Sequence, residues 1–354
     1  MNSIKSTALE PTAVELQGLS IGRKLWRLAP VYGLPIFTVL LIVLFSVILP
    51  NTFPTMLNLR SILGDKAIIA ILSLAAMIPM MAGRIDLTVG YGIVLWHVLA
   101  IALQTRMGLD WPMACAIVLL LGCLLGVING FLVELAQIDS FIATLGTGTT
   151  LYAIALWYTQ GRQVIGLLPK GFTELYTASL LGIPVAAFYV LAISIVLWVV
   201  AEYLPIGRYL YAIGANPRAA VLNGIPSRRF VIGAFVASGF LGAVAGIVLA
   251  ARLRIGQASV GLEFLLPALV GAFLGSTTIK PGRVNVWGTV IGVAILAVGI
   301  SGIQQLGGEF YVEPLFNGVT LLIAIGLAGY AQRKRGEVRH SRTTPKAPSA
   351  LPVT

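Results

Sequence analysis

The chain has 354 residues and a formal net charge of +11; 58% of its residues are apolar and only 10% are charged. Soluble domains carry about a quarter charged residues, so this composition excludes an ordinary soluble protein and is typical of a membrane protein. The basic residues form no face interleaved with aromatic side chains, which argues against nucleic acid as a partner.

Ten apolar windows follow the N-terminal segment. Residues 1–30 are mixed and polar, and we expect a cytoplasmic segment that is not a cleaved signal peptide. Charged residues then divide residues 31–332 into ten windows that are long enough, or nearly so, to cross a bilayer. The windows after Lys66 and Glu263 hold only 17 and 16 residues, and short spans interrupted by glycine are typical of broken helices that line a pathway. The sequence therefore predicts an all-α polytopic membrane protein with about ten transmembrane helices, some of them short or broken.

The basic residues are sorted between the two predicted sides of the membrane. Threading ten spans from a cytoplasmic N-terminus leaves seven of the 24 Lys and Arg residues outside, namely Arg60, Lys66, Arg106, Arg162, Lys170, Arg252 and Arg254. The others face the cytoplasm, as the positive-inside tendency requires. We therefore expect both termini in the cytoplasm, with residues 333–354 as a disordered tail.

Glycine occurs four residues apart in several windows, at Gly122, Gly126 and Gly130 and again at Gly288 and Gly292. This spacing lets helix backbones approach closely in lipid, so we expect tight helix packing there. A glycine-rich span, a short loop and a second span occur at 122–158 and again at 288–331, which suggests an inverted repeat.

A short basic stretch, residues 207–229, separates two long apolar runs. Asn216 can cap a helix, Pro217 suits its first position, and Gly224 can end it after Leu222 in a left-handed conformation. This predicts a helix of about two turns, roughly 10 Å long, which is too short to be stable without packing against something else. The chain has no GxxxxGK[ST] phosphate-binding loop, so it should not hydrolyse ATP by itself, and if it is a pump its energy must come from elsewhere. This helix is the expected contact point.

Asp86 is the informative acidic residue near the apolar spans, in the sequence GRIDLTVG at Gly83–Gly90. An aspartate near the bilayer centre costs about 2.5–3.5 kcal/mol, so it usually has a partner or a role. Arg84 is the expected partner if the segment is not helical. Three roles are open: a turn held by carboxylate–backbone bonds, a gate or substrate contact, and an ion-coupling acid.

Hydroxyl and amide groups gather in the next two spans. Residues 139–150 hold five hydroxyls, which can cap a helix, bond between helices or hydrogen-bond a polyol. Asn129 lies mid-span, where its amide needs partners, and interhelical bonding is the simpler role. Together with the Asp86 segment, these spans give a candidate pathway or gate: Asp86, Thr88, Asn129, Phe141, Thr144 and Thr147.

The remaining reactive side chains indicate no enzyme or metal site. His97 stands mid-span without a second histidine nearby and is expected to pack in the core. Cys115 and Cys123 are the only cysteines; they lack metal-ligand or redox spacing, and we expect small buried hydrophobic residues.

Four stretches resemble the permease subunit of bacterial ABC importers for sugars of the ribose, xylose and galactose type. The first is GRIDLTVG at 83–90, which is similar to the family's GGIDLSVG. The second is GVING at 126–130, followed by SFIATLGT at 140–147. The third runs from 207 to 225 and contains GRYLYAIGAN, and the last runs from ASVG at 258–261 to GT at 288–289.

The resemblance implies a multi-pass protein of the bacterial inner membrane. Its partners would be a second permease copy or paralogue, an ABC ATPase that uses ATP and magnesium, and a periplasmic sugar-binding protein. The chain itself would be neither an enzyme nor the holder of a cofactor. The resemblance also implies that the short helix is the coupling helix that docks on the ATPase, through Gly214, Asn216, Arg218, Ala219, Ala220, Leu222, Gly224 and Ile225.

The chain departs from the family pattern at a few positions. Arg84 replaces a glycine, as do Ser276, Pro281 and Val284 in a later glycine-rich region. These departures leave the kind of sugar open. The alternative function is an ion-coupled secondary transporter that uses Asp86.

Overall fold

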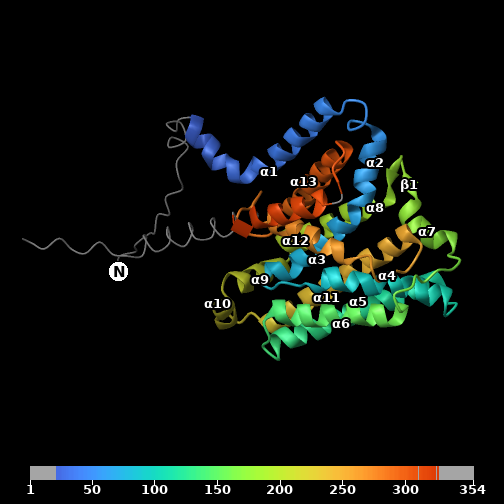
Figure 1. Ribbon diagram of the computed structural model, residues 1–354. Coiled ribbons are helices and arrows are strands. Elements are labelled where there is room, and N and C mark those ends of the chain that lie inside the picture. The colour runs from blue at the N-terminus through green and yellow to red at the C-terminus, as the bar shows by residue number, and fades with distance from the viewer. Residues whose placement is uncertain (1–20, 310, 324, 327–354) are drawn as a thin grey trace, which may run out of the picture.

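The computed structural model describes residues 21–309, 311–323 and 325–326, and for residues 21–31 it describes the backbone alone. The described chain is built almost entirely of helices (Figure 1). In chain order the elements are α1 (Ile21–Ile48), α2 (Met56–Asp65), α3 (Ala67–Met81), α4 (Thr88–Thr105), α5 (Trp111–Glu134), α6 (Ser140–Thr159), α7 (Lys170–Thr177), β1 (Ser179–Leu180), β2 (Ile183–Pro184), α8 (Val185–Glu202), α9 (Pro205–Ala215), α10 (Pro217–Leu222), α11 (Ser227–Leu253), the 3₁₀ turn η2 (Leu262–Phe264), α12 (Leu265–Leu274) and α13 (Val286–Gln305). A further apolar helix spans Val312–Ile323.

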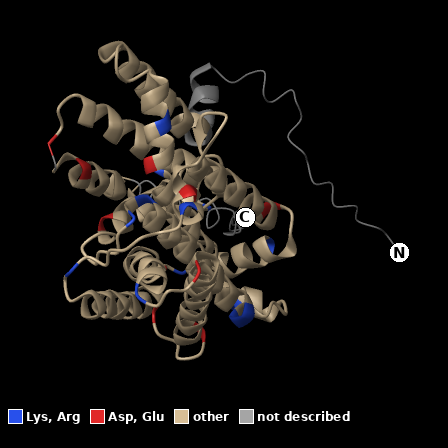
Figure 2. Cartoon of the chain, turned by 90° about the vertical axis from the view of Figure 1, so that its right-hand side faces the viewer, with Lys and Arg blue, Asp and Glu red and all other residues tan. Residues whose placement is uncertain are grey.

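Each of the ten predicted windows holds an apolar helix. Among the described residues, seven helical stretches are long and apolar enough to cross a membrane, with Met56–Met81 taken as one stretch, and three shorter apolar helices cover Tyr32–Ile48, Leu262–Leu274 and Val312–Ile323. Charged residues lie mostly in the loops and at helix ends, while the helices between them carry few (Figure 2). The prediction of an all-α polytopic membrane protein is therefore confirmed.

Helix α1 starts before the predicted membrane domain, which was expected from residue 31. Helix α1 already begins at Ile21, inside the segment that was expected to reach residue 30. Lys and Arg are good helix formers, so the basic residues between 23 and 27 do not end the helix. Residues 1–20 and the predicted tail 333–354 lie outside the described residues.

Helix α11 packs most closely on α5, and glycines make this approach possible. A Cβ atom on Gly122 would lie 2.5 Å from the carbonyl oxygen of Gly239, and one on Gly126 would lie 2.4 Å from that of Phe235. Such contacts are far below van der Waals distance, so only glycine permits this helix spacing. The close packing predicted for the glycines of α5 is confirmed.

The chain is not helical between the second and third predicted spans. Helix α3 ends at Met81, Gly83 has a φ of 72°, and the chain stays non-helical until α4 begins at Thr88. The side chains of α3 are buried almost without exception. The break therefore places Asp86 inside the protein.

Two ends of the bundle can be distinguished. Helices α9 and α10 lie at one end, while α2, α7 and the β1–β2 hairpin lie at the other (Figure 1). Helix α8 joins the two ends, because it follows the hairpin at Val185 and reaches α9 after Glu202. At 1.5 Å per residue its 18 residues span about 27 Å, close to the apolar thickness of a bilayer.

Candidate functional site

Helix α10 forms with the boundaries that its sequence predicts. The side-chain oxygen of Asn216 accepts a hydrogen bond from the backbone N–H of Ala219 at 3.0 Å, and Pro217 occupies the first helical position. Gly224, with a φ of 79°, turns the chain after the helix. Local cap and turn chemistry therefore determines this two-turn element.

The outer face of α10 is apolar and exposed. The side chains of Val221 and Leu222 are 58% and 87% exposed, beside the exposed Arg218, while Ala220 is buried against the protein and Ala219 is partly covered. A hollow of about 520 Å³ borders this face and reaches Arg84 and Glu134. An exposed apolar patch next to cationic side chains is typical of a surface that another protein covers.

Helix α9, which precedes α10 in the chain, contacts the end of α3. A Cβ atom on Gly214 would lie 2.3 Å from the carbonyl oxygen of Met81, so the two backbones touch there. Ala82 and Gly83, which follow α3 in the sequence, lie beside the same glycine. Helix α9 is therefore in direct backbone contact with the start of the break between α3 and α4.

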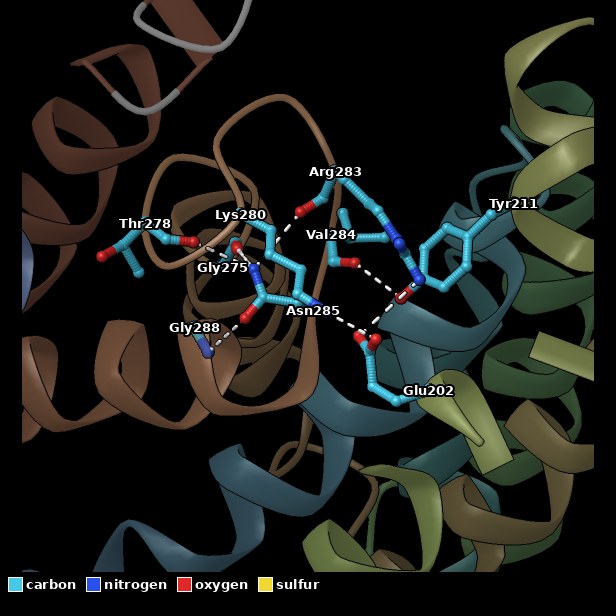
Figure 3. Close-up of polar contacts among 9 residues, drawn as sticks. All are labelled: Glu202, Tyr211, Gly275, Thr278, Lys280, Arg283, Val284, Asn285 and Gly288. Carbon is cyan, nitrogen blue, oxygen red and sulfur yellow. Dashed lines mark hydrogen bonds and ion pairs between the residues drawn. The ribbon is translucent and has the colours of Figure 1, made fainter. Parts of the chain in front are cut away.

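The loop between α12 and α13 also contacts α9, through Tyr211 (Figure 3). The guanidinium of Arg283 lies over the ring of Tyr211, 3.4 Å from its centroid. The hydroxyl of Tyr211 donates to the carbonyl of Val284 at 2.9 Å. Glu202, at the end of α8, pairs with Lys280 at 2.5 Å and with Arg283 at 3.6 Å. We call these four side chains, Glu202, Tyr211, Lys280 and Arg283, the α9 clamp.

The clamp combines charge with an aromatic face. A guanidinium over a ring is attracted by the electrons of the ring, and partial burial strengthens this attraction. Burial raises the pKa of the Tyr211 phenol above its ordinary value, against the opposing effect of Arg283. Tyr211 therefore remains a hydrogen-bond donor at neutral pH.

Asn285 fixes the shape of the loop that carries the clamp. Its Nδ2 donates to the carbonyls of Gly275 at 2.7 Å and Thr278 at 2.9 Å, and its Oδ1 accepts from the backbone of Gly288 at 2.8 Å (Figure 3). One buried amide thus ties the loop to the end of α12 and to the start of α13. The loop and α13 are therefore held as a single unit.

The departures from the glycine pattern lie in this same loop. The hydroxyl of Ser276 donates to the carbonyl of Phe273, and its carbonyl accepts from the backbone of Gly282, both at 2.7 Å. Pro281 precedes Gly282, whose φ is 81°, and Val284 is buried. The three replacements are accommodated within the folded loop.

Asp86 is buried and fully hydrogen-bonded. One carboxylate oxygen accepts from the backbone N–H of Thr88 at 2.9 Å and from the Thr88 hydroxyl, and the other accepts from Ser238 of α11 at 2.7 Å. The backbone of the same segment is bonded to α6, since Leu87 donates to Thr144 at 3.1 Å. This is the geometry of a turn held by carboxylate–backbone bonds.

Two further side chains extend this network to α5 and α6. Asn129 donates to the Thr88 hydroxyl at 3.2 Å and accepts from the Thr147 hydroxyl at 2.7 Å. Five of the six candidate pathway residues therefore lie together. Phe141 does not, because its side chain is 48% exposed on the surface of α6.

Arg84 has a different partner from the one predicted. Its guanidinium binds Glu134, at the end of α5, with a distance of 2.8 Å. Asp86 points to Thr88 and Ser238 instead, so the predicted Arg84–Asp86 pair was wrong. The reason is tertiary: the end of α5 brings a carboxylate beside Arg84, and Asp86 is directed inward.

The remaining predictions concern packing. His97 is fully buried, and its two ring nitrogens lie 2.9 Å from the carbonyl of Ile93 and 3.0 Å from that of Gln257, which confirms a packed core residue. Cys115 and Cys123 are free thiols, and both are only partly buried rather than buried as expected.

Sequence reasoning missed the partners that come from distant parts of the chain. Ser238, Glu134 and Tyr211 carry no motif that marks them as partners of Asp86, Arg84 and Arg283. A weak signal existed for Ser238, which is the only hydroxyl-bearing residue between Ser227 and Leu253. The α9 clamp had no comparable signal.

Comparison with known proteins agrees with this architecture. The family model described as "Branched-chain amino acid transport system / permease component" matches residues 58–327. The chain is 32% identical to the ribose import permease protein RbsC of Haemophilus influenzae over 300 residues, which cover 84% of this chain and 92% of the relative. It is 33% identical to RbsC of Bacillus subtilis, covering 84% and 91%, and 28% identical to the D-allose transport system permease protein AlsC of Escherichia coli, covering 84% and 90%. No solved structure matches the chain.

Proposed function

Because the chain belongs to the "Branched-chain amino acid transport system / permease component" family and is a permease subunit of an ABC-type importer, we propose that it passes a monosaccharide or related solute into the cytoplasm by alternating access, driven by a partner ATPase. The chain itself is not an enzyme. ATP and Mg²⁺ belong to the ATPase. The ribose and allose permeases among the relatives support a sugar as the solute.

The placement of α10 carries this proposal. A short helix with an exposed apolar face at Leu222 stands at one end of the bundle and is seated on the rest of the protein through α9. Such an element has little stability of its own, so its position follows whatever holds it. We assign the ATPase to this face, with Arg218, Val221 and Leu222 as its outermost contacts.

The motion would pass inward along two routes. Through Gly214, α9 touches the end of α3 and hence the break that contains Asp86. Through the α9 clamp, it is joined to the loop that starts α13. Closure of the ATPases would displace α10, and these contacts would tilt α3 and α13 together.

The Asp86 network is proposed as the inner gate. It joins four helices at the break, namely α4, α5, α6 and α11, through hydroxyl, amide and carboxylate groups. Every change in the angle between these helices must exchange hydrogen bonds in the network. The secondary-transporter alternative uses the same Asp86 as an ion site, although three protein donors already satisfy its carboxylate.

The complete importer is proposed to hold two permease chains, two ATPases and an external solute-binding protein. The chain is a multi-pass protein of the inner membrane, and the distribution of Lys and Arg supports cytoplasmic termini. Many apolar side chains of α1 are exposed in the single chain, such as Val47 at 73%. They are expected to contact lipid or the second permease.

Reconstitution separates the two energy sources. The permease, its ATPase and its solute-binding protein are placed in proteoliposomes, and uptake of labelled monosaccharides is followed with ATP present and with ion gradients collapsed by ionophores. Uptake that requires ATP and ignores the ionophores is the expected result. Uptake that needs an ion gradient and continues without ATP would contradict the proposal.

A further inference from the structure

A polar cavity of about 530 Å³ lies at the end of the bundle away from α10. It is enclosed by the junction of α2 and α3, the end of α11, the turn η2, the end of α13 and the helix Val312–Ile323. Its volume falls within the range of about 300–1,000 Å³ that is usual for small-molecule sites. None of the six candidate pathway residues lines it.

Three helices connect this cavity to the coupling end. Helix α3 runs from Lys66, in the cavity wall, to the residues that touch Gly214. Helix α11 follows α10 and ends next to Arg252 in the wall, and α13 runs from the α9 clamp to Gln304 in the wall. The cavity is therefore joined to the elements that we expect the ATPase to move.

Four of the five charged side chains in the wall form ion pairs within the protein. Lys66 pairs with Glu313 at 3.0 Å, and Arg252 pairs with Asp65 at 2.7 Å. Glu263 accepts a hydrogen bond from the backbone of Gly261 at 2.8 Å. An anionic solute would have to draw Lys66 or Arg252 out of its ion pair and leave a partly buried carboxylate uncompensated, which is costly. A neutral solute can bond to the same groups and leave the pairs intact.

Uncharged hydrogen-bonding groups complete the wall: Ser61, Ser301, Gln304 and Asn317. Asn317 is only 3% exposed, and its Oδ1 has no hydrogen-bond partner among the described residues. A buried acceptor without a partner costs about 1–3 kcal/mol, and a hydroxyl donor from a bound solute would remove that cost. Apolar walls at Ile69, Phe264 and Pro267 could cover the C–H faces of the same solute.

We propose that this cavity is the outer receiving site of the permease for a small, neutral, polyhydroxylated solute, with Asn317 as a direct hydrogen-bond acceptor. The proposal rests on the proposed import function and adds to it a location where the solute binds. It disfavours amino acids as solutes, because their carboxylate would meet a wall that holds three acidic and two basic side chains.

Thiol protection tests occupancy of the cavity. In the full complex with Cys115 and Cys123 replaced by alanine, Gln304→Cys is labelled with a membrane-impermeant thiol reagent, and Leu167→Cys, which is 99% exposed and outside the cavity, is the control. D-ribose, D-allose, D-xylose and D-galactose are added, and L-leucine is the competitor of the other class. We expect at least threefold slower labelling of Gln304→Cys with a sugar that the complex imports, and no change with leucine or at the control. Protection by leucine, or none by an imported sugar, would overturn the proposal.

The substitution Asn317→Leu separates binding from folding. Leucine has a similar volume and removes an unsatisfied buried acceptor, so thermal stability should stay equal or rise. Uptake of the imported sugar should nonetheless fall about tenfold. The control Asn51→Leu, at an exposed position outside the cavity, should leave both unchanged.

The outcomes distinguish a failure of the cavity assignment from a failure of the proposed sugar import. Unchanged uptake in Asn317→Leu, with wild-type uptake intact, would overturn the cavity assignment alone. A wild-type complex that imports none of the four sugars would overturn the proposed sugar import, and the assignment with it.

Discussion

The guanidinium of Arg283 lies 3.4 Å from the centre of the Tyr211 ring, and this contact joins the start of α13 to the helix that carries α10. The same arginine lies 3.6 Å from Glu202, at the end of α8. Arg283 therefore connects the start of α13 to the two consecutive helices α8 and α9, about 70 to 80 residues earlier in the chain. The α9 clamp gives the account its first testable consequence.

Replacing Tyr211 should uncouple transport from ATP hydrolysis. Tyr211→Leu removes both the ring under Arg283 and the hydrogen bond to Val284, whereas Tyr211→Phe keeps the ring. We expect the number of solute molecules imported per ATP to fall about five- to tenfold in Tyr211→Leu, and less than twofold in Tyr211→Phe. The measurement is uptake and phosphate release on the same proteoliposomes. Equal ratios in wild type and Tyr211→Leu would show that the clamp carries no motion.

Docking of the ATPase should depend on the apolar face of α10. Leu222→Glu places a charge in the centre of this face without straining the backbone, because Leu222 is helical and 87% exposed. We expect at least tenfold less ATPase to co-purify with the variant, while the amount of inserted permease is unchanged. Leu167→Glu introduces the same charge at the other end of the protein, and co-purification should be normal. A normal complex with Leu222→Glu would contradict the assignment of this face.

The packing of α5 on α11 should tolerate no side chain at Gly126. Gly126→Ala would place a methyl group 2.4 Å from the Phe235 carbonyl, and overpacking of this kind costs about 1–3 kcal/mol. Gly242→Ala is the matched control, because nothing lies within 4 Å of its added methyl group. Thermal unfolding in detergent should show a lower Tm for Gly126→Ala and an unchanged or higher Tm for Gly242→Ala. Similar Tm values for the two variants would refute the close approach.

Asp86 and Ser238 should be energetically coupled across 152 residues of sequence. Asp86→Ala and Ser238→Ala each remove the bond between them, so the loss of stability in the double variant should be smaller than the sum of the single losses. A coupling of about 1–3 kcal/mol is expected for a buried hydrogen bond to a charged group. Additive losses would mean that the two side chains do not interact in the membrane.

The sequence predicted the features that depend on neighbouring residues. The cap at Asn216, the proline after it and the glycine at 224 determine α10 locally, and charged residues delimit the apolar helices directly. The spacing of the glycines in α5 predicted a close contact with another helix. They did not identify the partner helix.

The relationships that sequence reasoning missed connect residues far apart in the chain. Arg84 binds Glu134, 50 residues away, and Lys66 binds Glu313, 247 residues away. Which acid reaches which base depends on how the helices pack, and periodicity carries no information about that. The outer cavity escaped prediction for the same reason, because five separate parts of the chain enclose it.

The central claim is that α10 faces the cytoplasm and the polar cavity faces the outside. Labelling with an impermeant thiol reagent, in right-side-out and inside-out vesicles from the same cells, tests both ends at once. With the two native cysteines replaced, Leu222→Cys should react only in inside-out vesicles without bound ATPase, and Gln304→Cys only in right-side-out vesicles. Labelling of both positions from one face, or the reverse pattern, would contradict the account.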